Sequence, residues 1–379
     1  MKILFLTLKT FSATGGIEKF NRCFCKALYD TCSEEDWQLK VLSAYDHLPV
    51  EIYLPKENFR GFSGQRLSFF AAALAEMKKA DTIFFSHINL APLITLANIL
   101  FPSKRTICLA HGREVWEPLS RLQSGALQVC HEVWCVSRYT ANILATQKGV
   151  SQERLHIFPN CLDPYFEITG PDVAPEILRK RFGVSANDKV ILTVARLAST
   201  EKFKGYDSVL DVLARVNEKA GPVKYLLAGK WDEIEKKRIT KIIDAGKLHN
   251  LVTLTGYIEE NELVSLYHLA DVFVLPSRKE GFGIVFIEAS WCGLPVIAGN
   301  ADGSVEALLG GKLGTLIDPV NNTELENAIG AVLLNPPAHN QKHEKRSLVM
   351  AHFGFIEFKN RLLCGLKQQT GWDYVPPGV

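Results

Sequence analysis

Short runs of apolar residues recur along the chain, separated by longer stretches in which apolar residues return at helical spacing. In the first half, the runs cover residues 1–9, 39–43, 82–86, 106–110 and 132–137. In the second half, they cover residues 189–195, 225–229, 252–257, 271–276 and 296–298. Strands that alternate with helices in this way build parallel sheets with right-handed crossovers. The pattern therefore predicts an α/β protein.

The chain has 379 residues, which is too many for one ordinary hydrophobic core. Its character changes around Phe158–Pro164, and a polar, proline-bearing stretch follows at 169–175. We therefore expect a first domain over 1–168 and a second over 169–352. A tail over 353–379 is expected to begin with an amphipathic helix at about Phe353–Gln368.

The stretch Ser277–Pro295 concentrates candidate chemistry in the second domain. It follows a predicted buried strand, and its acidic turn leads into a predicted helix after Gly283, so that Glu280 and Glu288 flank the helix start. A helix N-terminus offers N–H groups and a positive dipole end to a phosphate, whereas a carboxylate accepts hydrogen bonds from a diol. The stretch thus predicts a ligand with phosphate and hydroxyl groups. The alternative is that Glu280 is a solvated loop residue and Glu288 a helix-surface residue.

Glu280, seven intervening residues and Glu288 stand in the frame E-G-F-G-I-V-F-I-E-A. This frame resembles the signature of the retaining glycosyltransferases of family 4, which have the GT-B fold. The resemblance implies two Rossmann-like domains with a cleft between them, the first binding the acceptor and the second a nucleotide sugar. It also implies that the terminal helix crosses back to the first domain. Glu280 is then expected to be catalytic and to face the donor sugar, and Glu288 to hold the ribose. Further donor contacts are implied at Gly281, Phe282, Gly283, Ile284 and Val285, and near the nucleobase at Tyr257 and Ile258.

Cations follow the strand at 189–195 in the segment Arg196–Asp207. A planar guanidinium suits two phosphate oxygens, and a lysine beside a helix start suits the departing one. The segment resembles the Gly-Arg-Leu and Lys-Gly elements of the family, which implies catalytic roles for Arg196 and Lys204. Because the loop is long, Lys202 is an alternative to Lys204, and a solvated charge cluster is a further one.

Loops of the first domain supply the remaining candidates. Gly15 and Gly16 follow the first strand, where paired glycines allow close approach of a ligand or simply make a tight turn. The resemblance places them against the donor and places His111, which follows the strand at 106–110, beside the donor-sugar hydroxyls. Arg113 and Ser137 are expected to bind the acceptor, although a role as helix N-cap is a sufficient explanation for Ser137.

This sequence departs from the family pattern in three places. Ala195 stands where the Gly-Arg-Leu element of the family has its glycine. Cys161 stands where a glycine is common, and the loop 300–306 replaces the common Gly-Gly-x-x-E, which leaves donor contacts there open. No D-x-D motif occurs, so we expect no metal and no cofactor. The 9 cysteines form no C-x-x-C pair and indicate buried thiols in a reducing compartment.

The net charge of +2 argues against nucleic acid as a partner, since a surface that tracks phosphates needs a large basic excess. The apolar run at 1–9 is too short for a signal peptide, and no run reaches the length that spans a bilayer, so we expect a cytoplasmic protein. The basic and aromatic segment 58–79 is read either as a sheet-covering helix or as a face that meets the inner surface of a membrane.

Taken together, these residues predict a retaining glycosyltransferase that moves a sugar from a nucleoside diphosphate sugar, UDP- or GDP-linked, to an acceptor hydroxyl. Arg196, Lys204 and the helix amides after Glu280 would stabilise the leaving diphosphate. By family analogy, the acceptor is a saccharide, and a lipid-linked one in surface polysaccharide biosynthesis is favoured. The alternatives are a nucleotide-sugar epimerase of the same fold and a sugar-binding protein without catalysis. A nicotinamide-dependent oxidoreductase is disfavoured, because no G-x-G-x-x-G follows the first strand or Val194.

Overall fold

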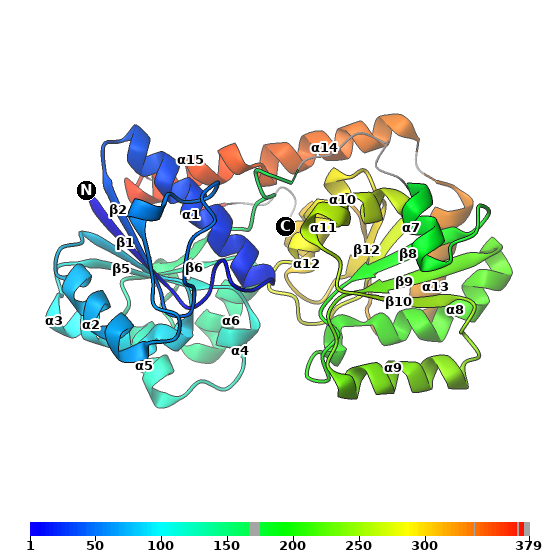
Figure 1. Cartoon of the computed structure of the whole chain (residues 1–379), viewed down its shortest axis with the longest axis horizontal. Helices are drawn as coiled ribbons and strands as arrows, with labels where there is room; N and C mark the ends of the chain where they lie inside the picture. The colour runs from blue at the N-terminus through cyan, green and yellow to red at the C-terminus, as the bar shows by residue number, and fades with distance from the viewer. Residues whose placement is uncertain (167–174, 337, 370, 375–379) are drawn as a thin grey trace. The chain divides into compact units, whose positions relative to one another are not determined.

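The structure is a computed structural model that describes residues 1–166, 175–336, 338–369 and 371–374. Two compact units are present, each built on one parallel sheet (Figure 1). The first contains the described residues of 1–164 and 353–374, and the second contains those of 165–352. The expected domain boundary after residue 168 and most of the expected linker at 169–175 lie outside the described residues, so the boundaries proposed from the sequence stay predictions.

The first unit has a sheet of 7 parallel strands in the order β3-β2-β1-β4-β5-β6-β7. Its strands are β1 (Lys2–Thr7), β2 (Gln38–Ser43), β3 (Phe59–Gly61), β4 (Thr82–Phe85), β5 (Arg105–Ala110), β6 (Glu132–Cys135) and β7 (Leu155–Ile157). Its helices are α1 (Gly16–Glu34), η1 (Lys56–Asn58), α2 (Arg66–Met77), η2 (Ile88–Leu90), α3 (Ala91–Leu100), α4 (Arg113–Trp116), α5 (Arg121–Val129), α6 (Arg138–Lys148), η3 (Gln152–Arg154) and α15 (Phe355–Leu366).

The second unit has a sheet of 6 parallel strands in the order β10-β9-β8-β11-β12-β13. Its strands are β8 (Lys189–Val194), β9 (Val223–Ala228), β10 (Val252–Gly256), β11 (Val272–Leu275), β12 (Val296–Gly299) and β13 (Thr315–Ile317). Its helices are α7 (Pro175–Phe182), η4 (Lys202–Lys204), α8 (Tyr206–Ala220), α9 (Glu233–Ala245), α10 (Glu260–Leu269), α11 (Ile284–Trp291), α12 (Ser304–Ala307), η5 (Leu309–Gly311), α13 (Asn322–Leu334) and α14 (His339–Phe353), whose last residue belongs to the first unit.

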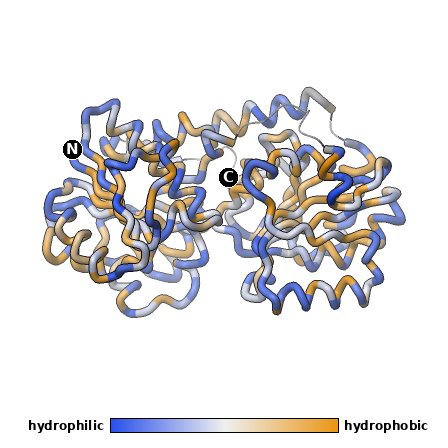
Figure 2. The backbone as a smooth tube through the Cα atoms, viewed as in Figure 1, coloured by the Kyte–Doolittle hydropathy of each residue, from blue (hydrophilic) through white to orange (hydrophobic). Residues whose placement is uncertain are grey.

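Both sheets are buried on both faces, as parallel sheets require. In the second unit, α8, α9 and α13 pack on one face of the sheet in a single apolar cluster. Figure 2 shows apolar residues along the strands of both units and polar residues along much of α9. Each apolar run that the sequence predicts as a strand coincides with a strand, so the α/β class is confirmed.

The terminal helix is also confirmed: α15 packs against α1 in the first unit. Arg105 fixes its end, because the guanidinium donates to the main-chain oxygens of Gly365 (2.9 Å) and Leu366 (3.1 Å). Its Nε also contacts Glu132 at 2.6 Å. The segment 58–79 contains a short strand, β3, before α2. On α2, Phe69, Ala73 and Met77 lie in the core, as expected of a sheet-covering helix.

Candidate functional site

Three loops of the second unit meet beyond the carboxyl ends of adjacent strands. The strands β8, β11 and β12 are neighbours in the sheet, and they are parallel, so the loops after them leave from one edge. The first loop carries Arg196 and Lys204, the second carries Glu280, and the third carries Asp302. The sheet order thus brings together residues that are far apart in the sequence.

Lys204 and Glu280 form an ion pair across the first two loops. The distance from Lys204 Nζ to Glu280 Oε1 is 2.5 Å, and the two side chains are only 17% and 13% exposed. Lys202, by contrast, is exposed. The geometry therefore favours Lys204 over Lys202 as the cation beside the acidic turn, and Glu280 is not a solvated loop residue.

Main-chain contacts hold the same two loops together. Phe203 O accepts hydrogen bonds from Arg278 N (3.0 Å) and from Ser277 Oγ (3.3 Å). Gly205 has a φ of +81°, and a Cβ there would lie 2.1 Å from Pro276 O. Only glycine fits this position, both for its conformation and for its space.

Asp302, which the sequence did not single out as a site residue, lies under the acidic turn. Its carboxylate is buried and accepts hydrogen bonds from the main-chain N–H groups of Glu280 (2.6 Å) and Ser304 (2.9 Å). The pKa of Asp302 is raised to about 7, because burial and repulsion by the Glu280 carboxylate outweigh the hydrogen bonds from Ser304 and the Glu280 N–H, which lower it. A polar residue just beyond the strand at 296–298 was the available sequence signal.

Helix α11 begins after Gly283, as predicted, and carries Glu288 in its second turn. Glu288 is 1% exposed, and its Oε2 accepts a hydrogen bond of 2.9 Å from the hydroxyl of Tyr267 on α10. Burial raises the pKa of Tyr267, so this group stays a donor. The alternative that Glu288 is a helix-surface residue is wrong, whereas its expected role in ribose binding stays a prediction.

Other predicted residues of the second unit lie around this centre. Arg196 is mostly exposed and pairs with Glu201 in its own loop. Tyr257 follows β10, and the Nζ of Lys230 lies over its ring, 4.3 Å from the ring centroid. Ile258 is buried beside it. On the acidic turn and the start of α11, Phe282 and Ile284 are buried, whereas Gly281, Gly283 and Val285 are partly exposed.

In the first unit, His111 follows β5 and packs against Phe20 with ring centroids 4.9 Å apart. Its Nε2 lies 2.9 Å from Ser86 O; because a carbonyl oxygen only accepts, Nε2 carries the proton and Nδ1 is left as an acceptor. Burial lowers the pKa of His111 to about 4, so the ring is neutral near pH 7. Glu114 fixes the main chain here by accepting from His111 N at 2.5 Å.

The remaining candidates of the first unit lie at the starts of helices, and their expected roles in binding stay predictions. Gly15 precedes α1, and a Cβ added to Gly16 would meet nothing within 4 Å, so open space surrounds that position. Arg113 Nε lies 3.6 Å from Oε1 of Glu117, the residue that follows the same short helix. Ser137 is buried and caps α6 by accepting from Thr140 N at 3.2 Å, which is the alternative role considered from the sequence.

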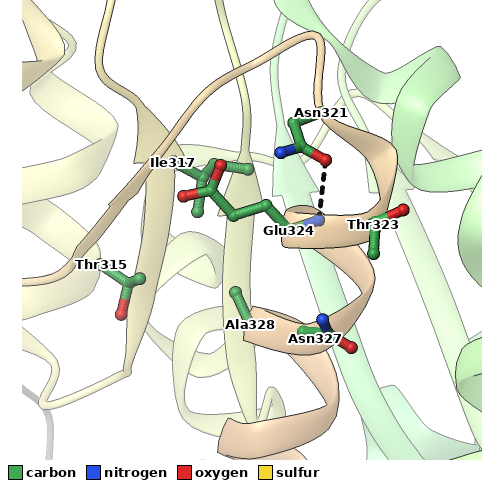
Figure 3. A pocket seen from close by; sticks show the side chains of 7 residues that line it. All are labelled: Thr315, Ile317, Asn321, Thr323, Glu324, Asn327 and Ala328. Carbon is green, nitrogen blue, oxygen red and sulfur yellow. Dashed lines mark hydrogen bonds between the residues drawn. The ribbon is translucent and has the colours of Figure 1, made fainter.

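A pocket of about 400 Å³ lies elsewhere in the second unit, between edge strand β13 and the start of α13 (Figure 3). Its lining residues are Thr315, Ile317, Asn321, Thr323, Glu324, Asn327 and Ala328. None of them belongs to the three loops, so this pocket is distinct from the predicted donor site. Within the described residues, no group of three or more His, Cys, Asp or Glu side chains could hold a metal ion. No helix in the same part of the chain has the length and apolar character needed to cross a bilayer.

Comparison of the fold with solved structures gives the class of protein. HepE of Anabaena, crystallised with UDP, superposes with a TM-score of 0.78 at 21% identity, covering 97% of this chain and 100% of that one. The lipopolysaccharide glycosyltransferase WaaG superposes with a TM-score of 0.69 at 16% identity, covering 97% of this chain and 100% of that one. The fold is therefore that of the GT-B glycosyltransferases.

Sequence comparisons identify the family. Residues 175–347 match the group 1 glycosyl transferases, and residues 23–166 match glycosyltransferase family 4. A GDP-mannose-dependent alpha-(1-6)-phosphatidylinositol monomannoside mannosyltransferase of Mycolicibacterium smegmatis is 30% identical over 270 residues, 68% of each chain. Mannosylfructose-phosphate synthase of Agrobacterium fabrum is 26% identical over 229 residues, 59% of this chain and 48% of that one. The chain belongs to the group 1 glycosyltransferases of family 4.

Proposed function

We propose that this glycosyltransferase is a retaining enzyme that moves a sugar from a nucleoside diphosphate sugar to an acceptor hydroxyl, with the three loops of the second unit as its donor site. The ion pair between Lys204 and Glu280 carries the proposal. It puts one cation and one carboxylate at the edge of a parallel sheet, where such folds bind nucleotides. These two charges match the two halves of the reaction.

The transition state separates charge. As the bond from the sugar carbon to the diphosphate oxygen breaks, the diphosphate becomes more negative and the sugar ring becomes positive. Lys204 stabilises the diphosphate, and Arg196 from the same loop assists it. Glu280 stabilises the positive ring and accepts hydrogen bonds from sugar hydroxyls. The acceptor oxygen then bonds to the sugar carbon on the face that the diphosphate leaves, and the acceptor proton passes to the departing phosphate oxygen.

Single variants of the two loops test these roles. Lys204→Ala and Glu280→Gln should each lower kcat by about a hundredfold, the cost of removing one preorganised electrostatic group. Lys202→Ala is the control, because Lys202 is an exposed lysine of the same loop. Near-normal turnover in Lys204→Ala or Glu280→Gln, or an equal loss in Lys202→Ala, would contradict the assignment. Glu288→Ala should mainly raise the donor KM, as expected of a ribose contact.

For the donor, we propose a UDP- or GDP-sugar, and GDP-mannose is the first to test, because a relative is named as a GDP-mannose-dependent mannosyltransferase. A thermal-shift panel of UDP-, GDP- and ADP-sugars finds the binder, since a ligand at a hundred times its Kd adds about 2.7 kcal/mol of stability. Product analysis by NMR then gives the anomeric configuration. An inverted product would refute the retaining mechanism, and a product formed without added acceptor would favour the epimerase alternative.

We propose that the acceptor is a lipid-linked saccharide and that no divalent metal is required. Lys204 and Arg196 supply the positive charge that a metal would otherwise bring to the diphosphate. Full turnover in the presence of a chelator is the expected result, and loss of turnover that added magnesium or manganese restores would refute metal independence. Comparison of free and lipid-linked saccharides as acceptors tests whether the acceptor is lipid-linked.

A lipid-linked acceptor favours contact with an anionic membrane surface, and we propose the start of α2 for it. Leu67 is 89% exposed there, next to the exposed Arg66, and Arg60 is exposed on β3. An exposed apolar side chain beside an arginine suits an anionic surface. Flotation with anionic vesicles at low salt should recover the protein, and Arg66→Glu should abolish recovery. Absence of wild-type binding would remove the proposal.

A further inference from the structure

We propose that Asp302 is a positioning residue for Glu280: its buried carboxylate holds the main chain of the acidic turn so that the Glu280 side chain stays beside Lys204. The catalytic part of this inference rests on the proposed function, whereas the structural part stands on the contacts alone. Asp302 itself touches main-chain groups and is not placed on the reacting atoms.

The contacts of Asp302 join two loops. One carboxylate oxygen accepts from Glu280 N at 2.6 Å, and the other accepts from Ser304 N at 2.9 Å in its own loop. Hydrogen bonds to a charged acceptor are roughly twice as strong as neutral ones. Because the side chain is only 2% exposed, water does not compete well for these N–H groups.

A second link next to Asp302 runs in the opposite direction. Gly303 N donates to Glu280 O at 2.9 Å, so both main-chain groups of Glu280 are held by the same short segment. A Cβ at Gly303 would lie 2.1 Å from Gly281 O, which shows how closely the loops approach. The Glu280 main chain is thus held at both its N–H and its C=O. Its side chain can then move only by rotation about its own bonds.

An ionised carboxylate is the side chain that these contacts demand. It offers an acceptor to each of the two N–H groups, whereas asparagine offers one acceptor and turns an N–H₂ donor toward the other. Glycine, common at this point of the family pattern, offers none. Asp302 therefore supplies a link that the common Gly-Gly-x-x-E loop cannot make through a side chain.

The charge of Asp302 should depend on pH near neutrality. Its pKa is raised to about 7, mainly by burial and in part by repulsion from Glu280 across the loop contact. Lys204 partly offsets the Glu280 charge, because the two form an ion pair, and Glu306 is the other acidic residue of the segment, on α12. Below about pH 7 the carboxyl group gains a proton, and the hydrogen bond that it accepts from the Glu280 N–H weakens.

Hydrogen exchange in the full chain tests the structural part without any substrate. Protection of the Glu280 amide should fall by about tenfold or more in Asp302→Asn, in line with loss of one hydrogen bond to a charged acceptor. Asp302→Gly is the second variant, in case the asparagine variant does not fold. Asp318→Asn is the matched control, because Asp318 is an exposed aspartate that accepts from Val320 N in another loop of this sheet. Unchanged protection at Glu280 in the folded variants overturns the inference.

Turnover tests the catalytic part, with GDP-mannose or UDP-glucose as donor, whichever the wild type uses. Asp302→Asn should lower kcat about tenfold, leave the donor KM within about twofold, and remove an acid limb from the kcat profile near pH 7. An unchanged kcat and pH profile would refute positioning. If the wild type turned over no nucleotide sugar, the proposed function would fail, and the exchange measurement would still decide the structural part.

Discussion

Asp302→Asn should change how folding stability depends on pH, because the carboxyl group ionises differently in the folded and unfolded chains. Burial raises the pKa of Asp302 from 3.8 to about 7. Between these values the unfolded chain has lost the proton, whereas the folded chain keeps it. Unfolding then releases a proton, so the free energy of unfolding falls as the pH rises through this window.

The size of the effect follows from the width of the window. Each pH unit changes the free energy of unfolding by about 1.4 kcal/mol for one proton, so the window from 3.8 to about 7 amounts to about 4 kcal/mol. Asparagine has no proton to lose, so the free energy of unfolding of the variant does not show this fall. In acid, asparagine and the protonated carboxyl group each offer one carbonyl acceptor and a donor, so the substitution costs little there.

Urea unfolding across this window, followed by tryptophan fluorescence, measures the effect, because Trp231 and Trp291 report on the second unit. The quantity to plot is the difference between variant and wild type, in which all other titrating groups cancel. Asp302→Asn should start close to the wild type in acid and gain on it as the pH rises, whereas Asp318→Asn should follow the wild type. Parallel curves for wild type and Asp302→Asn would refute the reasoning.

Other predictions concern the packing around Glu288 and around two glycines in helices. Tyr267→Phe should cost about 2 kcal/mol in urea unfolding, because it removes only the hydroxyl that donates to the buried Glu288; no loss would mean that the bond is not formed. Gly330→Ala in α13 should add about 1 kcal/mol, since a Cβ there meets nothing within 4 Å. Gly365→Ala in α15 should instead destabilise the first unit, because its Cβ would lie 2.9 Å from the Trp134 ring; equal effects of the two alanines on unfolding would contradict this packing.

Most strands that the sequence predicted are runs of apolar residues buried on both faces, whereas β10 is only partly buried. The strands β3, β7 and β13 were not predicted, because three residues are too few to show a pattern. Helix α14 was not predicted either, since most of its residues are polar and its apolar positions give no clear stripe. Local patterns thus predict the elements that bury the most apolar surface, and they miss short or polar ones.

The candidate site also contains residues whose roles local sequence patterns could not predict. Lys204 was the residue expected from the sequence, with Lys202 as its alternative, and the ion pair with Glu280 favours Lys204. Asp302 was recognised only as part of a loop that departs from the family pattern, because nothing local shows that its side chain turns inward. Tyr267 was not considered at all, since an aromatic residue in a helix is expected in any core.

By itself, the sequence determined the two parallel sheets and which loops carry the charged residues, because helix and strand periods are local properties of the chain. Only the tertiary structure decided which of those residues meet. Lys204 lies 76 positions from Glu280, Asp302 lies 22 positions from it, and Tyr267 lies 21 positions from Glu288. These pairs form because β8, β11 and β12 are neighbours and α10 packs near α11, and strand order and helix packing are set by the burial of the whole unit.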